Sequence, residues 1–398
     1  MKLRNCYQLS LAIAVFCGSG LATARSANAS SFSYTVQDLG TFSGGTYSSG
    51  YALNNNGQVV GDADVPNASS FGSGSHAFLY SDGSLQDLGT LPGDNYSGAS
   101  GINNNGQIVG TSSNSSGSNH AFLFSDGSLQ SLGTLAGGTY SIASGINDQG
   151  QVIGSANTGP SGSSIYGDKH AFISSSGSLR DLGTLAGDKY SDAYGINNQG
   201  QVVGTSSTSS GSNHAFLYSD GALQDLGALP TYKYSAAYGI NNRSQIVGDS
   251  FNISNGFPST EHAFLYSEGL FQDLGTLGGN SSEARSINEL GQVVGESSTS
   301  DGRAHAFLYR DDALIDLNSL IPTDSGWVLE DAFGINQDGQ IVGYGTINGE
   351  THAFLATDPP ATAVPEPDSI LGTVALAAFG MGTWLKRFRK RKNLTIFG

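Results

Sequence analysis

Three short sequence blocks recur in a fixed order along most of this 398-residue chain. A His-Ala-Phe tripeptide begins at each of the seven histidines, and wherever an Asp-Leu pair follows, its aspartate lies eleven residues after the histidine. A third block, Gly-Ile-Asn-Asn-x-Gly-Gln-Val-Val-Gly in its commonest form, also occurs seven times. A repeat of about 20 to 50 residues builds a fold in which one supersecondary unit packs against the next. The tripeptides begin at His76, His120, His170, His214, His262, His305 and His352, and the third block is anchored at Asn54, Asn103, Asn147, Asn197, Asn241, Asn288 and Asn336.

Each repeat contains four runs that suit β-strands. In the repeat that begins at His76 they read HAFLY, SLQDLG, SGASGIN and QIVG, and the breaks between them are rich in Gly, Asn, Asp and Ser. These residues tolerate the tight or left-handed backbone that a chain reversal needs. With 57 glycines and 13% charged residues, the composition also favours β structure with many turns. We therefore predict an all-β fold with four antiparallel strands per repeat.

Adjacent apolar residues in these runs indicate strands that are covered on both faces. A surface strand alternates apolar and polar residues, whereas QVVG, QIVG and AFLY place apolar residues side by side. Sheets packed radially, as in a β-propeller, give each strand two covered faces, and a one-layer solenoid does so less well. This pattern favours a propeller, with a β-solenoid as the alternative.

The two ends of the repeated region complement each other. The region opens at FSYTVQDLG, which lacks a preceding HAFLY run, and closes at THAFLATD, which lacks a following QDLG run. Together they complete one repeat, so we expect residues 34–39 to lie beside residues 353–356. The predicted fold is a seven-bladed β-propeller of four-stranded blades, closed by pairing of N-terminal and C-terminal strands.

Both ends of the chain carry targeting features. Residues 1–29 are typical of a signal peptide, with Lys2 and Arg4 before an apolar run and small residues at the end, and cleavage is expected after Ala29, with Ala24 as the alternative. Both cysteines lie in this leader, so no disulfide is predicted in the exported part. Residues 369–385 form an apolar run that predicts a transmembrane helix, and residues 386–398 form a basic tail that the positive-inside rule places in the cytoplasm.

The charge of the region between the two ends argues against nucleic acid as a partner. All 33 acidic residues lie there, together with eight of the 17 basic residues, which gives a net charge of about −25. A surface of this sign repels phosphate backbones.

The repeats resemble the HAF-type extracellular repeat over residues 31–358, since the three blocks recur together. That resemblance implies export and tandem β repeats, without an established activity. The end of the chain resembles a PEP-CTERM sorting tail, with the motif Pro365, Glu366 and Pro367 followed by the apolar run and the basic cluster. It implies a Gram-negative-type bacterium that makes exopolysaccharide, signal peptidase and exosortase as partners, and removal of the membrane helix; a lasting single-span anchor is the alternative. The domains expected are then a propeller over 30–358 and a Pro-rich linker over 359–368.

Some repeats depart from the pattern. Ser244 replaces a glycine in the fifth copy of the third block, and Glu289 and Leu290 interrupt the Asn-rich turn of the sixth copy. The seventh repeat is longer than the others. These changes weaken the prediction for the last blades more than for the first five.

The histidines and the acidic turns are interpreted as structural. Equivalent positions of a ring lie apart around its axis, whereas a zinc ion needs three or four ligands about 2 Å away. Each histidine is expected to bond to the neighbouring blade from the start of a strand. Turns such as NNNGQ lack the acidic density of a calcium loop, so no cofactor or metal site is predicted, although the acidic surface allows weak calcium binding.

A tyrosine nine residues after the Asp-Leu position is the candidate binding feature. Strand order places these tyrosine loops on one rim with the variable connections that precede each HAF run. A ring with a polar tip suits stacking on sugars, but equally suits packing between blades. The series comprises Tyr47, Tyr96, Tyr140, Tyr190 and Tyr234, with Ser282 and a late Trp327 breaking it.

The sequence thus predicts an exported, non-catalytic repeat protein of the cell surface or exopolysaccharide matrix, with a structural or adhesive role. A carbohydrate-binding, lectin-like propeller is the alternative. A polysaccharide hydrolase or lyase is the third candidate, because non-repeated polar residues cluster in the last two repeats, namely Glu283, Arg285, Glu330 and Asp331.

Overall fold

The computed structural model describes residues 34–65, 74–159, 168–175, 177–254 and 257–358. The chain divides into two units, residues 1–31 and 32–398, and the described residues all belong to the second. The predicted signal peptide with Ala29, the motif Pro365–Pro367, the membrane helix and the basic tail lie outside the described residues. Within the described ranges, no helix has the length and hydrophobicity that crossing a membrane requires.

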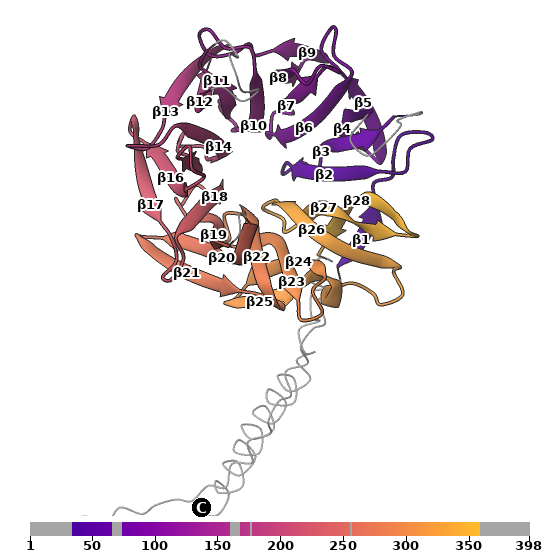
Figure 1. The fold of residues 1–398 in the computed structure, drawn as a ribbon. Coiled ribbons are helices and arrows are strands. Elements are labelled where there is room, and N and C mark those ends of the chain that lie inside the picture. Colours follow the sequence, from indigo (N-terminus) through magenta and orange to yellow (C-terminus); the bar gives the residue numbers. More distant parts are fainter. Residues whose placement is uncertain (1–33, 66–73, 160–167, 176, 255–256, 359–398) are drawn as a thin grey trace, which may run out of the picture. The chain divides into compact units, whose positions relative to one another are not determined.

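The described residues form antiparallel sheets that follow one another around an axis (Figure 1). The first three sheets contain β2 (Ser48–Leu53), β3 (Val59–Asp64), β4 (Ser75–Ser81) and β5 (Ser84–Gly89); β6 (Tyr96–Ile102), β7 (Ile108–Ser113), β8 (Asn119–Ser125) and β9 (Ser128–Ser131); and β10 (Ser141–Ile146), β11 (Val152–Asn157), β12 (Lys169–Ser175) and β13 (Ser178–Gly183). The next contains β14 (Tyr190–Ile196), β15 (Val202–Ser207), β16 (Asn213–Ser219) and β17 (Ala222–Gly227).

The remaining strands form an eight-stranded sheet and a final four-stranded one. The eight-stranded sheet joins β18 (Tyr234–Ile240), β19 (Ile246–Ser254), β20 (Phe257–Ser267) and β21 (Leu270–Gly275) to β22 (Gly278–Ile287), β23 (Val293–Thr299), β24 (Ala304–Arg310) and β25 (Ala313–Asp316). The two halves meet through one parallel pair, Glu261 with Ser281. The last sheet contains β26 (Trp327–Ile335), β27 (Ile341–Ile347), β28 (Glu350–Thr357) and β1 (Thr35–Asp38), and a 3₁₀ turn, η1 (Leu317–Leu320), precedes it.

The four strand types predicted from the repeat are present, but each sheet is offset from the repeat as written. A sheet begins with the SGASGIN-type and QIVG-type strands of one repeat and ends with the HAFLY-type and QDLG-type strands of the next. The QDLG-type strand is therefore the outer strand of its sheet, and the chain crosses from there to the inner strand of the next sheet (Figure 1).

Adjacent valines confirm that the strands are covered on both faces. Val59 and Val60 are both fully buried, yet they belong to different core clusters. Val59 packs with Val342 and Leu355 of the last sheet, whereas Val60 packs in the cluster that holds Ile108 and Phe122 of the next sheet. Burial of apolar surface between consecutive sheets is thus the main source of stability, at about 25 cal/mol for each Å².

The predicted pairing of the two ends is confirmed. Strand β1 pairs antiparallel with β28, with Val36 opposite Ala356 and Asp38 opposite Phe354. The backbone N–H of Leu39 also donates to the carbonyl of Ala353 at 3.0 Å. The segment that opens the described region therefore completes the sheet formed by the segment that ends it.

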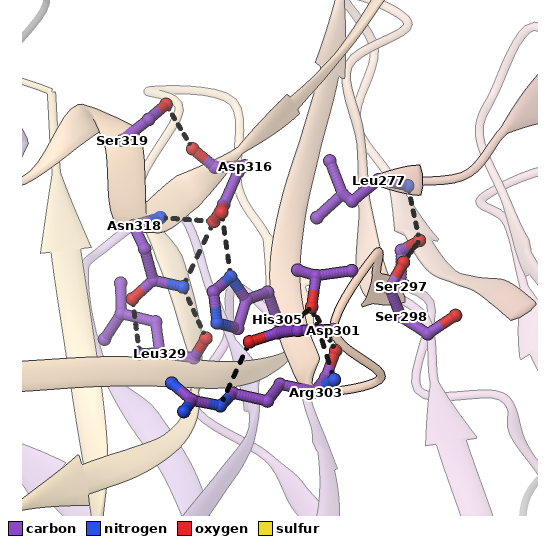
Figure 2. Close-up of polar contacts among 11 residues, drawn as sticks. Leu277, Ser297, Ser298, Asp301, Arg303, His305, Asp316, Asn318, Ser319 and Leu329 are labelled. Atoms are coloured by element: carbon purple, nitrogen blue, oxygen red, sulfur yellow. Dashed lines mark hydrogen bonds and ion pairs between the residues drawn. The ribbon is translucent and has the colours of Figure 1, made fainter. Parts of the chain in front are cut away.

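Five of the seven histidines bond within their own sheets, so the prediction that each histidine reaches the neighbouring blade is wrong. His76, His170, His262 and His305 contact the aspartate eleven residues later at 2.8–3.0 Å, and Figure 2 shows the pair of His305 with Asp316. His352 contacts Asp38 in the same way across the closing pair of strands, at 3.0 Å. The HAFLY-type and QDLG-type strands are hairpin neighbours, which is why residues eleven apart meet. His120 and His214 instead face the loop that leads into their own sheet, at Asp94 and Asp188.

A serine at the start of the inner strand makes the bond between sheets that was expected of histidine. The N–H of Ala77 donates to Oγ of Ser97 in the next sheet at 2.8 Å, and this hydroxyl donates to the carbonyl of Gly89 at 2.6 Å. Between β25 and the last sheet Asn318 takes the place of this serine, since its side-chain amide bonds to both the N–H and the carbonyl of Leu329 (Figure 2). The equivalent serines are Ser48, Ser141, Ser191, Ser235 and Ser282.

Candidate functional site

A closed ring of seven asparagine side chains surrounds one end of the axis. The Nδ2 of Asn54 donates to the backbone carbonyl of Asn103 at 3.1 Å, and each asparagine bonds to the next in the same way. The last, Asn336, donates to the carbonyl of Asn54 at 3.1 Å and so completes the circle. All seven side chains are buried. The intermediate bonds are made by Asn103, Asn147, Asn197, Asn241 and Asn288.

A second ring is stacked on the first and is formed by the next residue of each turn. Here the backbone N–H of one residue donates to the side-chain oxygen of its counterpart in the following turn, from Asn55 to Asn104 and finally from Gln337 back to Asn55. Glu289, which interrupts the sequence pattern, keeps the ring intact because its carboxylate accepts from the N–H of Asn242 at 2.9 Å. Partial burial disfavours the charge of Asp148, but hydrogen bonds from Asn104 and Asn198 lower the pKa of this carboxyl below its usual value.

Two cavities lie end to end along the axis. The lower one, of about 180 Å³, is bordered by the asparagine rings, and the upper one, of about 240 Å³, by the middle of the inner strands. Seven aliphatic residues line both cavities and thus form the constriction between them. These are Leu53, Ile102, Ile146, Ile196, Ile240, Ile287 and Ile335.

The upper cavity is where the repeat loses its regularity. Seven equivalent positions, two residues before the constriction, hold side chains of very different sizes. Five large side chains on consecutive inner strands contact one another, and two serines occupy the remaining positions. In chain order these residues are Tyr51, Ser100, Ser144, Tyr194, Tyr238, Arg285 and Phe333.

Arg285 is the one cation among these lining residues and is held on four sides. Its guanidinium carbon lies 5.8 Å from the ring centroid of Tyr238 and 5.3 Å from that of Phe333. It contacts Glu283 of its own strand, and its Nη2 lies 3.0 Å from Asp331 of the next sheet. Burial works against its charge, but Asp331 and Glu283 outweigh it and raise the pKa of Arg285.

More carboxylates surround this cluster than one arginine can neutralise. Burial, together with repulsion from Asp331, raises the pKa of Glu296 to about 7. Burial raises the pKa of Asp331 to about 6, although Arg285 acts in the opposite direction. Burial and the nearby Glu261 and Glu283 also raise the pKa of Asp249 well above its usual value. Ionising these carboxyl groups in the folded protein is costly, because it brings like charges together in a poorly solvated region.

The raised pKa values predict that the fold weakens as pH rises. Because the folded-state pKa values of Glu296 and Asp331 lie above the ordinary 4.5 and 3.8, the folded protein binds more protons than the unfolded chain across that interval. Stability from these groups is present at about pH 4 and is lost as pH rises through 7. We expect the free energy of unfolding to fall by about 2 kcal/mol between pH 5 and 8, after allowance for solvent screening at Glu296.

This pH dependence is measured by urea unfolding at several pH values. Glu296→Gln is expected to flatten the profile and Glu268→Gln, on an exposed turn, to leave it unchanged. A Glu296→Gln profile as steep as that of the wild type contradicts the assignment.

The predicted tyrosine rim lies above the upper cavity. Tyr96, Tyr190 and Tyr234 are the first residues of their inner strands, and Tyr47 and Tyr140 immediately precede theirs. All five are half-buried. The expected sharing of a rim with the variable connections is confirmed, since the loop residue Asn95 accepts from the N–H of Ser115 at 3.3 Å.

Two positions in the tyrosine series need correction. Ser282 is not a rim position: one residue is missing from the preceding loop, so it takes the inter-sheet serine place and is buried. Trp327 is also buried and packs edge-on against Phe354. The exposed Val328 pairs with Thr346 at the corresponding end of β26.

Arg285, Glu283 and Asp331 are brought together, and Glu330 bonds to Thr346 at 2.5 Å. The sequence predicts that these four residues cluster, but it does not predict the axial rings.

Comparison with known proteins supports the fold. A family described as a protein of unknown function (DUF3466) matches residues 230–355, less than half of the chain. The propeller domain of the Trilobed protease from Pyrococcus furiosus is similar with a TM-score of 0.53 at 8% identity, over 79% of this chain and 93% of that one. A puromycin-hydrolyzing peptidase from Mycobacterium tuberculosis gives 0.52 at 11% identity, over 83% of this chain and 55% of that one.

A third structure, YCF48 bound to D1 peptide, gives a TM-score of 0.50 at 12% identity, over 83% of this chain and 97% of that one. None of the curated proteins matches. The chain therefore has an all-β propeller fold. At such identities the likeness concerns the fold alone.

Proposed function

We propose that this chain is an exported protein of the bacterial cell surface or exopolysaccharide matrix, in which a seven-bladed propeller has a structural and adhesive role. Each four-strand group is counted as one blade, the two halves of the eight-stranded sheet included. Export rests on the apolar leader that ends at Ala29, and sorting by exosortase rests on the motif Pro365, Glu366 and Pro367.

Adhesion is proposed to come from binding of polysaccharide at the tyrosine rim. The observation that carries this proposal is the placement of five half-buried tyrosines at one end of the inner strands, around the axis. An aromatic ring stacks on the apolar face of a sugar while its hydroxyl reaches a sugar hydroxyl. The net charge of about −25 favours neutral chains over acidic ones.

A non-catalytic role fits the state of the carboxylates beside the cavity. Glycoside hydrolysis needs one carboxyl group that protonates the leaving oxygen and a second that acts as base or nucleophile. Glu283 and Asp331 are both paired with Arg285, and neither is among the residues that line the cavity. This pairing supports binding rather than bond cleavage.

Replacing Tyr96, Tyr140 and Tyr190 together by Ala is expected to weaken binding to the host's exopolysaccharide at least tenfold, because three stacking contacts of about 1 kcal/mol each are lost. Binding is measured by calorimetry on protein purified from its own host. The intact mass of the purified protein defines its N-terminus and its C-terminus. The same three positions changed to Phe keep the rings and are expected to retain most of the affinity. Leu270→Ala changes an exposed apolar residue on the outer strand β21 and serves as the matched control. Unchanged binding by the alanine variant rules out the rim.

A further inference from the structure

We propose that the upper axial cavity receives the terminal sugar ring of a neutral polysaccharide chain, end-on, with the tyrosine rim as its entrance. This inference rests on the proposed polysaccharide binding and assigns it a site of different geometry. It would make the protein a binder of chain ends rather than of chain interiors.

The first support is where the repeat varies. All seven inner strands have Leu or Ile at the constriction, and in each the next residue is the asparagine of the first ring. Two residues before the constriction, the same strands carry Tyr, Ser, Ser, Tyr, Tyr, Arg and Phe. Equivalent strands that pack in the same way need equivalent residues. Different residues at these seven equivalent positions therefore point to a role other than packing of the fold.

The unequal residues give the cavity two different sides. On one side the rings of Tyr194 and Tyr238 contact each other in a tilted arrangement, with centroids 5.3 Å apart, and the series continues through Arg285 to Phe333 and Tyr51, whose rings meet edge-on at 5.2 Å. On the other side Ser100 and Ser144 leave open space and supply hydroxyl groups. An aromatic wall facing a hydroxylated wall matches a pyranose ring, which has an apolar face and a polar edge.

Tyr194 is the exposed platform of this wall. The residue is 37% exposed, although it lines the axial cavity, and it follows Ser144 in the order of the inner strands. Its neighbour Tyr238 lies against Arg285, and Tyr194 is the one residue of this wall that is exposed rather than half-buried.

The size and the lower end of the cavity favour a chain terminus. A volume of about 240 Å³ is below the roughly 300–1,000 Å³ of pockets that hold drug-sized ligands, and leaves room for one ring. Below it the seven aliphatic residues separate it from the lower cavity, which the two hydrogen-bonded rings border. A polysaccharide that enters from the tyrosine side therefore stops after its last sugar.

The charges select against acidic sugars. The guanidinium of Arg285 is already matched by Glu283 and Asp331, and Glu296 adds a further carboxyl group nearby. A uronate or sulfate would meet this excess of carboxyl groups without a free cation among the residues that line the cavity.

The test uses the host's neutral exopolysaccharide cut into fractions of decreasing chain length. End-on binding predicts one protein per chain at every length, so the sites per gram of polysaccharide rise as chains shorten. Ser144→Trp, which fills the open side, and Tyr194→Ala, which removes the platform, are each expected to weaken binding at least tenfold. Ser209→Trp, the same change on an exposed loop, is the control, and thermal unfolding identifies variants that fail to fold.

The outcomes separate this inference from the proposed function. Sites per gram that stay constant with chain length, or full binding by a folded Ser144→Trp, overturn the cavity assignment and leave rim binding intact. No binding of any fraction by the wild type overturns both proposals. Binding of an oligoglucuronate probe as tight as that of the neutral fractions overturns the charge argument and with it the stated ligand class.

Discussion

Gly110→Ala is expected to destabilise the fold by about 4 kcal/mol, near the upper end of single-residue effects. A Cβ atom on Gly110 would lie 2.0 Å from the carbonyl oxygen of Gly98 and 2.8 Å from the Cα of Ala99. Both are backbone atoms of the paired inner strand, so neither moves by a side-chain rotation. The ring of Phe122 would lie at 2.8 Å as well and closes the remaining direction.

The close approach arises from a β-bulge in the inner strand. The register of β6 with β7 shifts between Ala99 and Gly101, which brings the inner-strand carbonyl over the glycine that ends the third sequence block, here Ile-Val-Gly. The same approach, at 1.8–2.0 Å, recurs at Gly61, Gly154, Gly204, Gly248, Gly295 and Gly343.

Gly98→Ala is the matched control, because it alters the opposing strand at the same bulge. A Cβ on Gly98 would meet its nearest neighbour, the Cβ of Asp62, at an ordinary 3.8 Å. Its effect is expected to stay within about 1 kcal/mol. Urea unfolding of both variants checks the pair, and equal stabilities for Gly110→Ala and Gly98→Ala contradict the steric account.

The architecture was predictable because its causes are local and repeated. Adjacent apolar residues such as Val59 and Val60 predict two covered faces, and the incomplete repeats at the two ends predict the pairing of β1 with β28. The offset between repeat and sheet was not predicted, because the spacing between strands does not show which of the four connections in a repeat crosses from one sheet to the next.

The polar contacts were harder to predict because their partners lie one repeat away. Asn147 bonds to Asn197, 50 residues later. In the sequence both asparagines are typical turn residues, and nothing in either turn indicates a bond to the other. The histidine contacts were assigned to the wrong sheet for a different reason: most of their aspartates lie only eleven residues later, in the paired strand of the same hairpin, so the contact stays inside one sheet. Arg285, Glu283 and Asp331 occur once each, so no periodicity indicated that Asp331, 46 residues away, faces the arginine.

Asn197→Asp is expected to destabilise the protein by about 3 kcal/mol at neutral pH, although it only replaces the Nδ2 amino group by an oxygen. The Nδ2 of Asn197 donates to Oε1 of Gln201 at 2.7 Å and to the carbonyl of Asn241 at 3.1 Å. An ionised aspartate would turn an oxygen toward both acceptors in a buried site, with loss of two bonds and added repulsion. The Oδ1, which accepts from the N–H groups of Gln199 and Gln201, is retained.

The loss should shrink in acid, because a protonated carboxyl group regains one donor. Burial and two facing acceptors disfavour the charged form of the new aspartate, so its ionisation removes stability as pH rises. Asn213→Asp, the same change at the start of β16 and outside the ring, serves as the control. Urea unfolding at pH 4.5 and pH 7.5 measures both, and a penalty independent of pH contradicts the assigned donors.

The same substitution at Asn336 tests whether the circle is complete. Asn336 donates to the carbonyl of Asn54, 282 residues earlier, so in a closed ring it has the same two acceptors as Asn197. The penalty of Asn336→Asp is then expected to match that of Asn197→Asp within about 1 kcal/mol. In an open array of the same repeats Asn336 would have no following turn, and its amide would face water. A penalty for Asn336→Asp close to that of the control Asn213→Asp would therefore exclude closure, however well the interior repeats pack.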